Sequence, residues 1–129
     1  MFEMNADVLR FFDGRPWELG LFERFAESVL SEFPEAVMKV QKTQVSFYDR
    51  RMFACVSLMP ARRKAERLER FITVSFGLAA PLESPRAVPV MVRANRWTHH
   101  VIVGRAEEID AELTGWVREA HALAARPGR

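Results

Sequence analysis

The residues best suited to chemistry lie in one short stretch, residues 96–100, with the sequence Arg-Trp-Thr-His-His. A guanidinium, an indole, a hydroxyl and two imidazoles occupy consecutive positions, and the β-branched run Val101–Val103 follows at once. This composition predicts a polar cluster that leads into a strand. Guanidinium groups bind anions and an indole offers a stacking surface. We therefore expect ligand recognition at this cluster.

A second polar group lies earlier in the chain, where Ser46 and Tyr48 alternate with Val45 and Phe47. Such alternation predicts a strand with a polar face, and Lys42 and Thr43 come just before it. If helices cover only the apolar face, the polar face could meet Arg93, Arg96 and His100. That arrangement suits a small anionic or aromatic ligand, or a protein segment. The expected site comprises Lys42, Thr43, Ser46, Tyr48, Arg96, Trp97 and His100. The alternative is a solvated face on which Lys42 pairs with an acid.

Neither a metal nor another cofactor is expected. His99 and His100 are adjacent in a predicted strand, so their side chains point to opposite faces and cannot hold one ion together. Cys55 lies in the middle of another predicted strand, where we expect a structural position in the core with a buried, protonated thiol. It is the only cysteine, so no intrachain disulfide can form.

Two other functions are possible. The first is accessory binding of nucleic acid through basic residues, namely Arg50, Arg51, Arg62, Arg63 and Lys64. Against it, 19 basic and 17 acidic side chains leave a net charge of only +2, whereas nucleic-acid binding requires a clustered basic surface. The second is an enzyme in which His100 acts as a base with Ser46 or Tyr48. The sequence has no phosphate-binding loop, dinucleotide fingerprint or nucleophile elbow. We therefore expect a binding module rather than an enzyme.

The composition is that of a soluble globular domain. Of 129 residues, 49% are hydrophobic and 28% charged, which predicts one domain over residues 1–129 with a core from about 7 to 124. No apolar run is long enough to span a membrane, and the N-terminus does not resemble a signal peptide. We expect a cytoplasmic protein without a membrane partner, either a monomer or a homodimer.

The periodicity of apolar residues predicts which elements position these side chains. Steps of three and four predict helices over residues 5–12, 17–33 and 106–124. Alternating or β-branched runs predict strands over residues 36–42, 44–48, 52–59, 71–76, 88–92 and 98–103. Short connections favour antiparallel pairing. The expected fold is α+β, with two layers: a mainly antiparallel sheet of about six strands, and two N-terminal helices and one C-terminal helix on one of its faces.

Several ordered segments carry a resemblance to a known family. They are Phe12 with Gly14 and Pro16, residues 41–48, residues 52–57, residues 73–78, residues 84–86, residues 95–100, and residues 107–110 with Trp116. On these segments the chain resembles the bacterial domain-of-unknown-function (DUF) 5655 family, from about Phe12 to Leu123. The resemblance implies no established reaction, ligand or catalytic residue.

Overall fold

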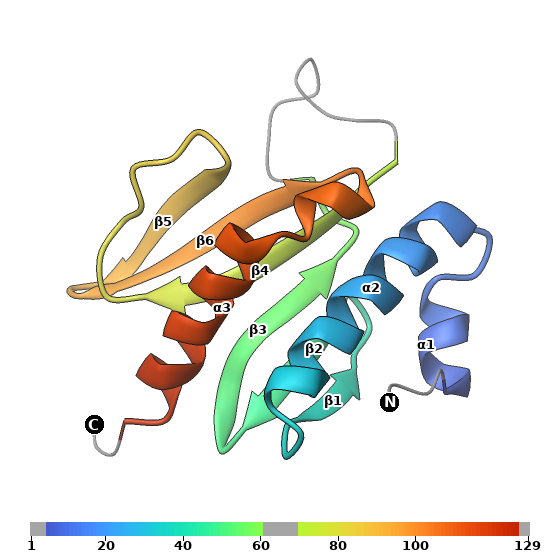
Figure 1. Cartoon of the computed structure of the whole chain (residues 1–129), viewed down its shortest axis with the longest axis horizontal. Helices are drawn as coiled ribbons and strands as arrows, with labels where there is room; N and C mark the ends of the chain where they lie inside the picture. The colour runs from blue at the N-terminus through green and yellow to red at the C-terminus, as the bar shows by residue number, and fades with distance from the viewer. Residues whose placement is uncertain (1–4, 61–69, 127–129) are drawn as a thin grey trace.

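A computed structural model describes residues 5–60 and 70–126. Over these residues the order is two helices, six strands and a final helix, which confirms the predicted α+β fold (Figure 1). None of these helices is both long enough and apolar enough to cross a membrane. The elements are α1 (Ala6–Phe11), α2 (Pro16–Glu32), β1 (Val37–Val40), β2 (Gln44–Asp49), β3 (Arg51–Ser57), β4 (Ile72–Leu78), β5 (Ala87–Arg93), β6 (Arg96–Val103) and α3 (Ala111–Ala124).

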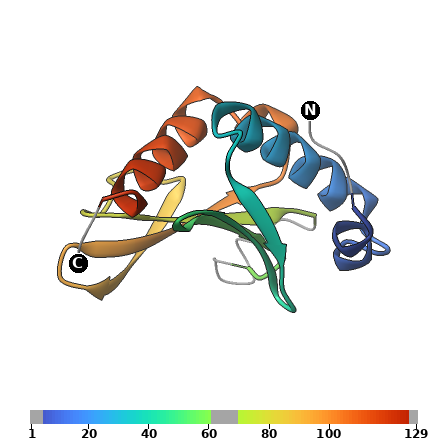
Figure 2. The same ribbon diagram turned by 90° about the horizontal axis from the view of Figure 1, so that it is seen from below.

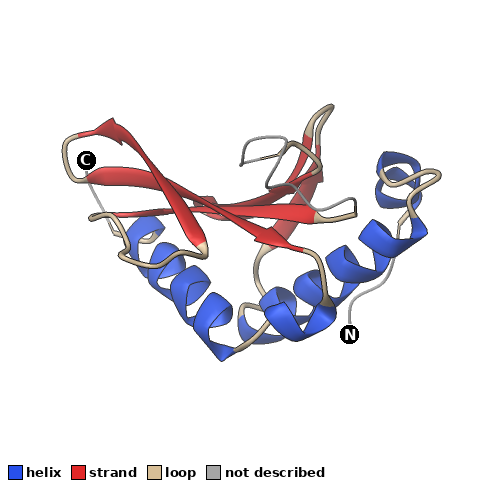
Figure 3. Cartoon of the chain, turned by 90° about the horizontal axis from the view of Figure 1, so that it is seen from above, coloured by secondary structure: helices blue, strands red, loops and turns tan. Residues whose placement is uncertain are grey.

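The six strands form one antiparallel sheet in the order β1-β2-β3-β4-β6-β5. Helices α2 and α3 lie on the same face of this sheet, and α1 lies beside the N-terminal end of α2 (Figure 2). No helix of residues 5–60 and 70–126 lies on the opposite face (Figure 3). We call it the open face.

The core lies between the sheet and the two long helices. Phe22 and Phe25 of α2 pack against Phe47 of β2, with ring centroids 6.2 and 5.7 Å apart. Trp116 of α3 stacks on Phe76 of β4 at 6.0 Å. Each such buried aromatic ring contributes roughly 1.5–3 kcal/mol to stability. The helices are therefore fixed on one face mainly by aromatic packing.

A β-bulge changes which side chains of β3 face the helices. Strict alternation predicts Phe53 and Cys55 on one face and Ala54 on the other. In the structure the register shifts between Phe47 and Tyr48, and Phe53 is buried against Phe33 of α2's C-terminal cap at a centroid distance of 5.5 Å. A bulge adds an unpaired residue, so both Phe53 and Ala54 reach the core. Cys55 pairs with Ser46 and Ser75 and lies on the open face, so the expectation of a core position is wrong.

The C-terminal helix begins later than its charge pattern predicts. Residues 106–108 form a short 3-10 turn, and α3 starts at Ala111. The carboxylate of Glu108 accepts hydrogen bonds from the backbone N–H groups of Gly104 and Arg105, at 2.7 and 3.2 Å. The side chain of Asp110 accepts from the N–H of Leu113 at 3.0 Å and caps α3. Two acidic caps in succession therefore divide the predicted helix in two.

The sheet divides between its two central strands. Strand β3 pairs with β4 only from Ala54 to Ser57, opposite Phe76 to Thr73. Beyond that point β3 pairs only with β2, and the last residues of β4 pair only with β6. Figure 1 shows β3 and β4 diverging, with the C-terminal end of α3 at the opening. We call this opening the fork.

Candidate functional site

The open face carries a polar row that crosses four strands. The register aligns Ser46 of β2, Cys55 of β3, Ser75 of β4 and His100 of β6. The hydroxyl groups of the row already have hydrogen-bond partners. The hydroxyl of Ser46 donates to Oε1 of Gln41 at 2.6 Å and accepts from Nε2 of Gln44 at 2.7 Å. The register places Ser46 and His100 on the same face of the sheet.

The same strand order separates His100 from its expected partners. Strands β3 and β4 lie between β2 and β6, and strands in a sheet are about 4.8 Å apart, so His100 lies roughly 14 Å from Ser46. The hydroxyl that meets His100 is that of Ser75, with Oγ 2.7 Å from Nδ1. The expectation that His100 could act with Ser46 or Tyr48 is corrected, because both belong to β2.

The remaining members of the expected site do not converge either. Lys42 and Thr43 are exposed in the turn between β1 and β2. Tyr48 lies at the other end of β2, where Nζ of Lys39 is 5.1 Å from its ring centroid. Trp97 pairs with Leu78 and Met91 and points to the face opposite that of His100, because the two are three positions apart in one strand.

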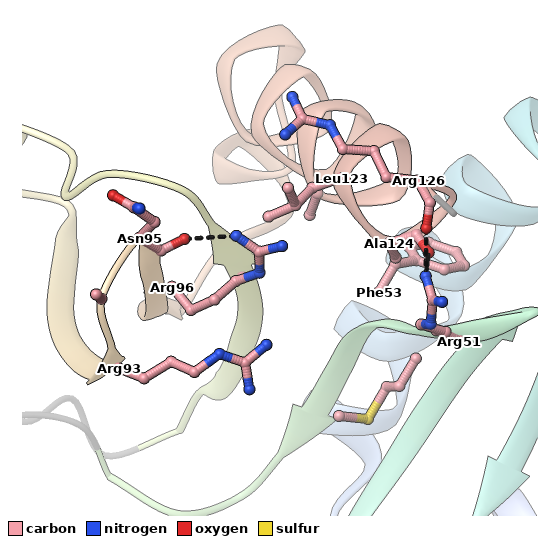
Figure 4. A pocket seen from close by; sticks show the side chains of 12 residues that line it. Arg51, Phe53, Arg93, Asn95, Arg96, Leu123, Ala124 and Arg126 are labelled. Carbon is pink, nitrogen blue, oxygen red and sulfur yellow. Dashed lines mark hydrogen bonds between the residues drawn. The ribbon is translucent and has the colours of Figure 1, made fainter. Parts of the chain in front are cut away.

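Of the expected residues, Arg96 is the one that lines a large pocket. This pocket, at the fork, has a volume of about 690 Å³. Its walls come from the start of β3, the β5–β6 hairpin and the end of α3 (Figure 4). We call it the fork pocket. Its lining residues are Arg51, Met52, Phe53, Gly77, Arg93, Ala94, Asn95, Arg96, Ala120, Leu123, Ala124 and Arg126.

Local backbone geometry explains how the hairpin places two arginines at the pocket. Strand β5 ends at Arg93 and β6 begins at Arg96, which leaves a two-residue turn of Ala94 and Asn95. Asn95 has a φ of 62°, a left-handed conformation that asparagine adopts more readily than most residues. The tight turn makes Arg93 and Arg96 a register pair. Figure 4 shows both side chains reaching from the hairpin into the pocket.

The fork pocket is strongly cationic. Four of its described lining residues are arginines and none is acidic. Within residues 5–60 and 70–126, Arg93 and Arg96 form no ion pair, and one guanidinium nitrogen of Arg96 donates to the carbonyl of Asn95 at 2.7 Å. Arg51 has a different role. It donates to the carbonyls of Ala124 and Arg126 and so offsets the negative end of the α3 dipole.

Sequence reasoning did not identify the wall of the pocket that faces the hairpin. Met52 precedes Phe53 at the bulge of β3, while Leu123 and Arg126 belong to the end of α3 and lie far away in sequence. No local pattern links these residues to the hairpin. The useful local signal was the pair of arginines that flanks the two-residue turn at Ala94 and Asn95.

The basic residues of the nucleic-acid alternative divide into three groups. Arg62, Arg63 and Lys64 lie outside the described residues. Arg50 is exposed in the β2–β3 turn with a φ of 74°. Arg51 uses its guanidinium to bond the end of α3. Binding of nucleic acid through these residues stays a prediction.

The two adjacent histidines have different environments. His99 is fully buried and stacks on Phe76 at 5.5 Å, and its Nε2 accepts a hydrogen bond from the N–H of Leu82 at 3.0 Å. Burial lowers the pKa of His99; it outweighs the opposing effect of the Trp97 backbone, and the charge of His100 acts in the same direction as burial. Burial also lowers the pKa of His100. Both imidazoles are therefore neutral near pH 7.

The structure also bears on metal binding and on the reactivity of the Cys55 thiol. Among the described residues, no cluster of three or more His, Cys, Asp or Glu side chains is arranged to hold a metal ion. Burial raises the pKa of the Cys55 thiol, against the opposite effect of a hydrogen bond with Ser75. The thiol is thus protonated at neutral pH and has little nucleophilic character.

These features describe an α+β protein with an arginine-lined pocket where its sheet divides. The chain belongs to the domain-of-unknown-function family DUF5655, whose model matches residues 11–124. No curated protein and no solved structure matches the chain.

Proposed function

We propose that this protein is a non-enzymatic binding module for a small anionic ligand and that the fork pocket is its binding site. The observation that carries the proposal is the pair of guanidinium groups of Arg93 and Arg96, which face the pocket without an ion pair in the described part of the chain. Like charges held close together repel one another, and a bound anion relieves that repulsion.

The expected site on the open face contributes one residue to this proposal, Arg96. The hydroxyl and imidazole groups of the polar row already bond one another, as in the pair of Ser75 and His100 at 2.7 Å. A ligand on the open face would have to replace those bonds. Among the described residues, Arg93 and Arg96 offer charged donors that no acid holds, and one nitrogen of Arg96 bonds the carbonyl of Asn95. These charged donors favour the pocket as the binding site.

The test is a titration followed by two-dimensional NMR of the backbone amides. Inorganic phosphate, phenyl phosphate and benzoate are added separately to the full chain in low-salt buffer. At least one is expected to shift amide signals of the β5–β6 hairpin and of the end of α3. Arg93→Gln and Arg96→Gln should each weaken binding about tenfold or more, since a charge-assisted hydrogen bond contributes roughly 1.5 kcal/mol or more.

Arg24→Gln is the matched control, because Arg24 is exposed on α2, away from the pocket. It also removes one positive charge, and it should leave the affinity for the anion unchanged apart from the small effect of a lower net charge. The proposal is overturned if none of the three anions shifts pocket signals, or if binding is equally strong in Arg24→Gln and in the two pocket variants. Shifts confined to the β2–β3 turn at Arg50 would overturn the proposal and favour the nucleic-acid alternative.

A further inference from the structure

The size of the fork pocket indicates what else the ligand carries besides its charge. A volume of about 690 Å³ lies within the roughly 300–1,000 Å³ range typical of sites for organic molecules. An inorganic anion would occupy only a small part of this space. Water would fill the remainder, and the apolar surface of the pocket would stay wet.

That apolar surface lies across the pocket from the arginines of the hairpin. Met52 of β3 and Leu123 of α3 line it, together with the buried Phe53 and Ala120. Met52 is 46% exposed, so its side chain is accessible to a ligand. In Figure 4 the side chain of Leu123 points from α3 toward the guanidinium of Arg96. Met52 also lines the pocket, and its sulfur lies 3.8 Å from Nε2 of Gln44. The pocket thus joins the two arginines of the hairpin to a wall of β3 and α3 that carries apolar side chains beside Arg51 and Arg126.

Both walls favour a flat ring. A guanidinium pairs with a carboxylate or phosphate through its edge and stacks on an aromatic ring through its face, and two guanidiniums allow both contacts at once. Methionine sulfur makes favourable contacts with aromatic rings. We propose that the fork pocket binds an aromatic acid, its carboxylate or phosphate held by one of Arg93 and Arg96 and its ring between the arginines and Met52 with Leu123. This inference rests on the proposed anion-binding function.

The test separates the contribution of the ring from that of the charge. Affinities of the full chain are measured by calorimetry or NMR for inorganic phosphate, phenyl phosphate and uncharged phenol. Burial of a phenyl ring is expected to make phenyl phosphate bind at least tenfold more tightly than phosphate. Phenol should bind more weakly than phenyl phosphate by a similar factor, because it lacks the charge.

Two variants assign the ring contribution to the apolar wall. Met52→Gln and Leu123→Gln keep the side-chain length but remove apolar surface, and each should reduce the preference for phenyl phosphate over phosphate severalfold. Leu9→Gln is the matched control, since Leu9 is 49% exposed on α1, away from the pocket. Circular dichroism confirms that each variant is folded. Met52 is exposed, so its variant remains informative if the Leu123 variant fails to fold.

Each outcome decides between the two proposals. If phosphate and phenyl phosphate bind equally well and depend on Arg93 and Arg96, the pocket is an anion site and the aromatic inference fails. If phenol binds as tightly as phenyl phosphate, the ring is recognised without charge and both proposals fail. If the preference for phenyl phosphate survives both wall variants, the ring lies elsewhere and the inference is overturned.

Discussion

A guanidinium nitrogen of Arg51 donates a hydrogen bond to the carbonyl oxygen of Ala124 at 2.8 Å. The same nitrogen reaches the carbonyl of Arg126 at 2.6 Å. Carbonyls in the last turn of a helix have no partner within the helix, so Arg51 supplies one from the first residue of β3. This contact attaches the end of α3 to one side of the fork and so fixes one wall of the pocket.

The first prediction concerns this attachment. Arg51→Met keeps most of the aliphatic length and removes every donor, so it should lower the free energy of unfolding by about 1–2 kcal/mol. Urea denaturation of the full chain measures the change. Arg24→Met, an exposed substitution on α2, should alter stability by less than about 0.5 kcal/mol. If the two variants are equally stable, Arg51 does not hold α3.

A second prediction compares two glycines that differ in backbone conformation. Gly14 joins α1 to α2 with a φ of 75°, whereas Gly20 lies inside α2, and a Cβ atom at either position would have no neighbour within 4 Å. The added methyl group therefore meets no clash at either position, and the backbone conformation alone determines how each Gly→Ala substitution changes stability. Gly14→Ala should cost about 1–2 kcal/mol, because an L-residue is strained in the left-handed region.

The same change inside the helix should have the opposite sign. Gly20→Ala is expected to raise the free energy of unfolding by up to about 1 kcal/mol, because alanine loses less backbone entropy on entering a helix. Thermal and urea unfolding of the two variants provide the measurement. A stabilising Gly14→Ala would show that the chain between α1 and α2 does not keep its left-handed residue in solution.

The positions of individual side chains show how far sequence reasoning reaches. The alternation of Val45 and Phe47 with Ser46 is a local property of one strand, and it correctly predicted which face meets the helices. The same alternation explains why Trp97 and His100 point to opposite faces of the sheet, because they are three positions apart in one strand. The prediction grouped Trp97 with His100 by the chemistry of their side chains and did not apply this rule to them.

The candidate site depends on relations that are not local. The order in which β4, β6 and β5 pair decides that the Arg93–Arg96 turn lies at the fork. The bulge opposite Phe47 and Tyr48 decides that Phe53 turns to the core beside Met52. Neither feature has a pattern in a single sequence, since each is set by packing between strands that are distant along the chain. The fold was therefore predictable and the pocket was not.

The third prediction concerns pH and follows from the burial of His99. The folded-state pKa of His99 lies below its ordinary value, which is about 6.5 in an unfolded chain. Between these two values the unfolded chain binds more protons than the folded protein does. The contribution of His99 to the free energy of unfolding is therefore fully present above about pH 6.5 and is lost as the pH falls toward the folded-state pKa. The loss can reach about 1.4 kcal/mol per pH unit for each such histidine.

His99→Gln tests this prediction, because glutamine can still accept a hydrogen bond from the N–H of Leu82 but does not titrate. Urea unfolding at several pH values between 7.5 and roughly 5 should show a smaller loss of stability in the variant than in the wild-type chain. The difference between the two curves isolates His99, since His100 and the pair of His121 with Asp49 are present in both proteins. Parallel curves would mean that His99 keeps its ordinary pKa in the folded protein.

The fourth prediction concerns the thiol of the polar row. Burial raises the pKa of Cys55, whereas the hydrogen bond with Ser75 favours the thiolate. Only the thiolate reacts with a disulfide reagent, so native Cys55 should react at least severalfold more slowly near pH 7.5 than Cys55 in the urea-unfolded chain. Ser75→Ala should slow the native reaction further, because the hydroxyl that favours the thiolate is lost. Ser57→Ala, on the same face of β3, should leave the rate unchanged. A native thiol that reacts as fast as the unfolded one would place Cys55 in an electropositive environment and identify the row as a reactive site.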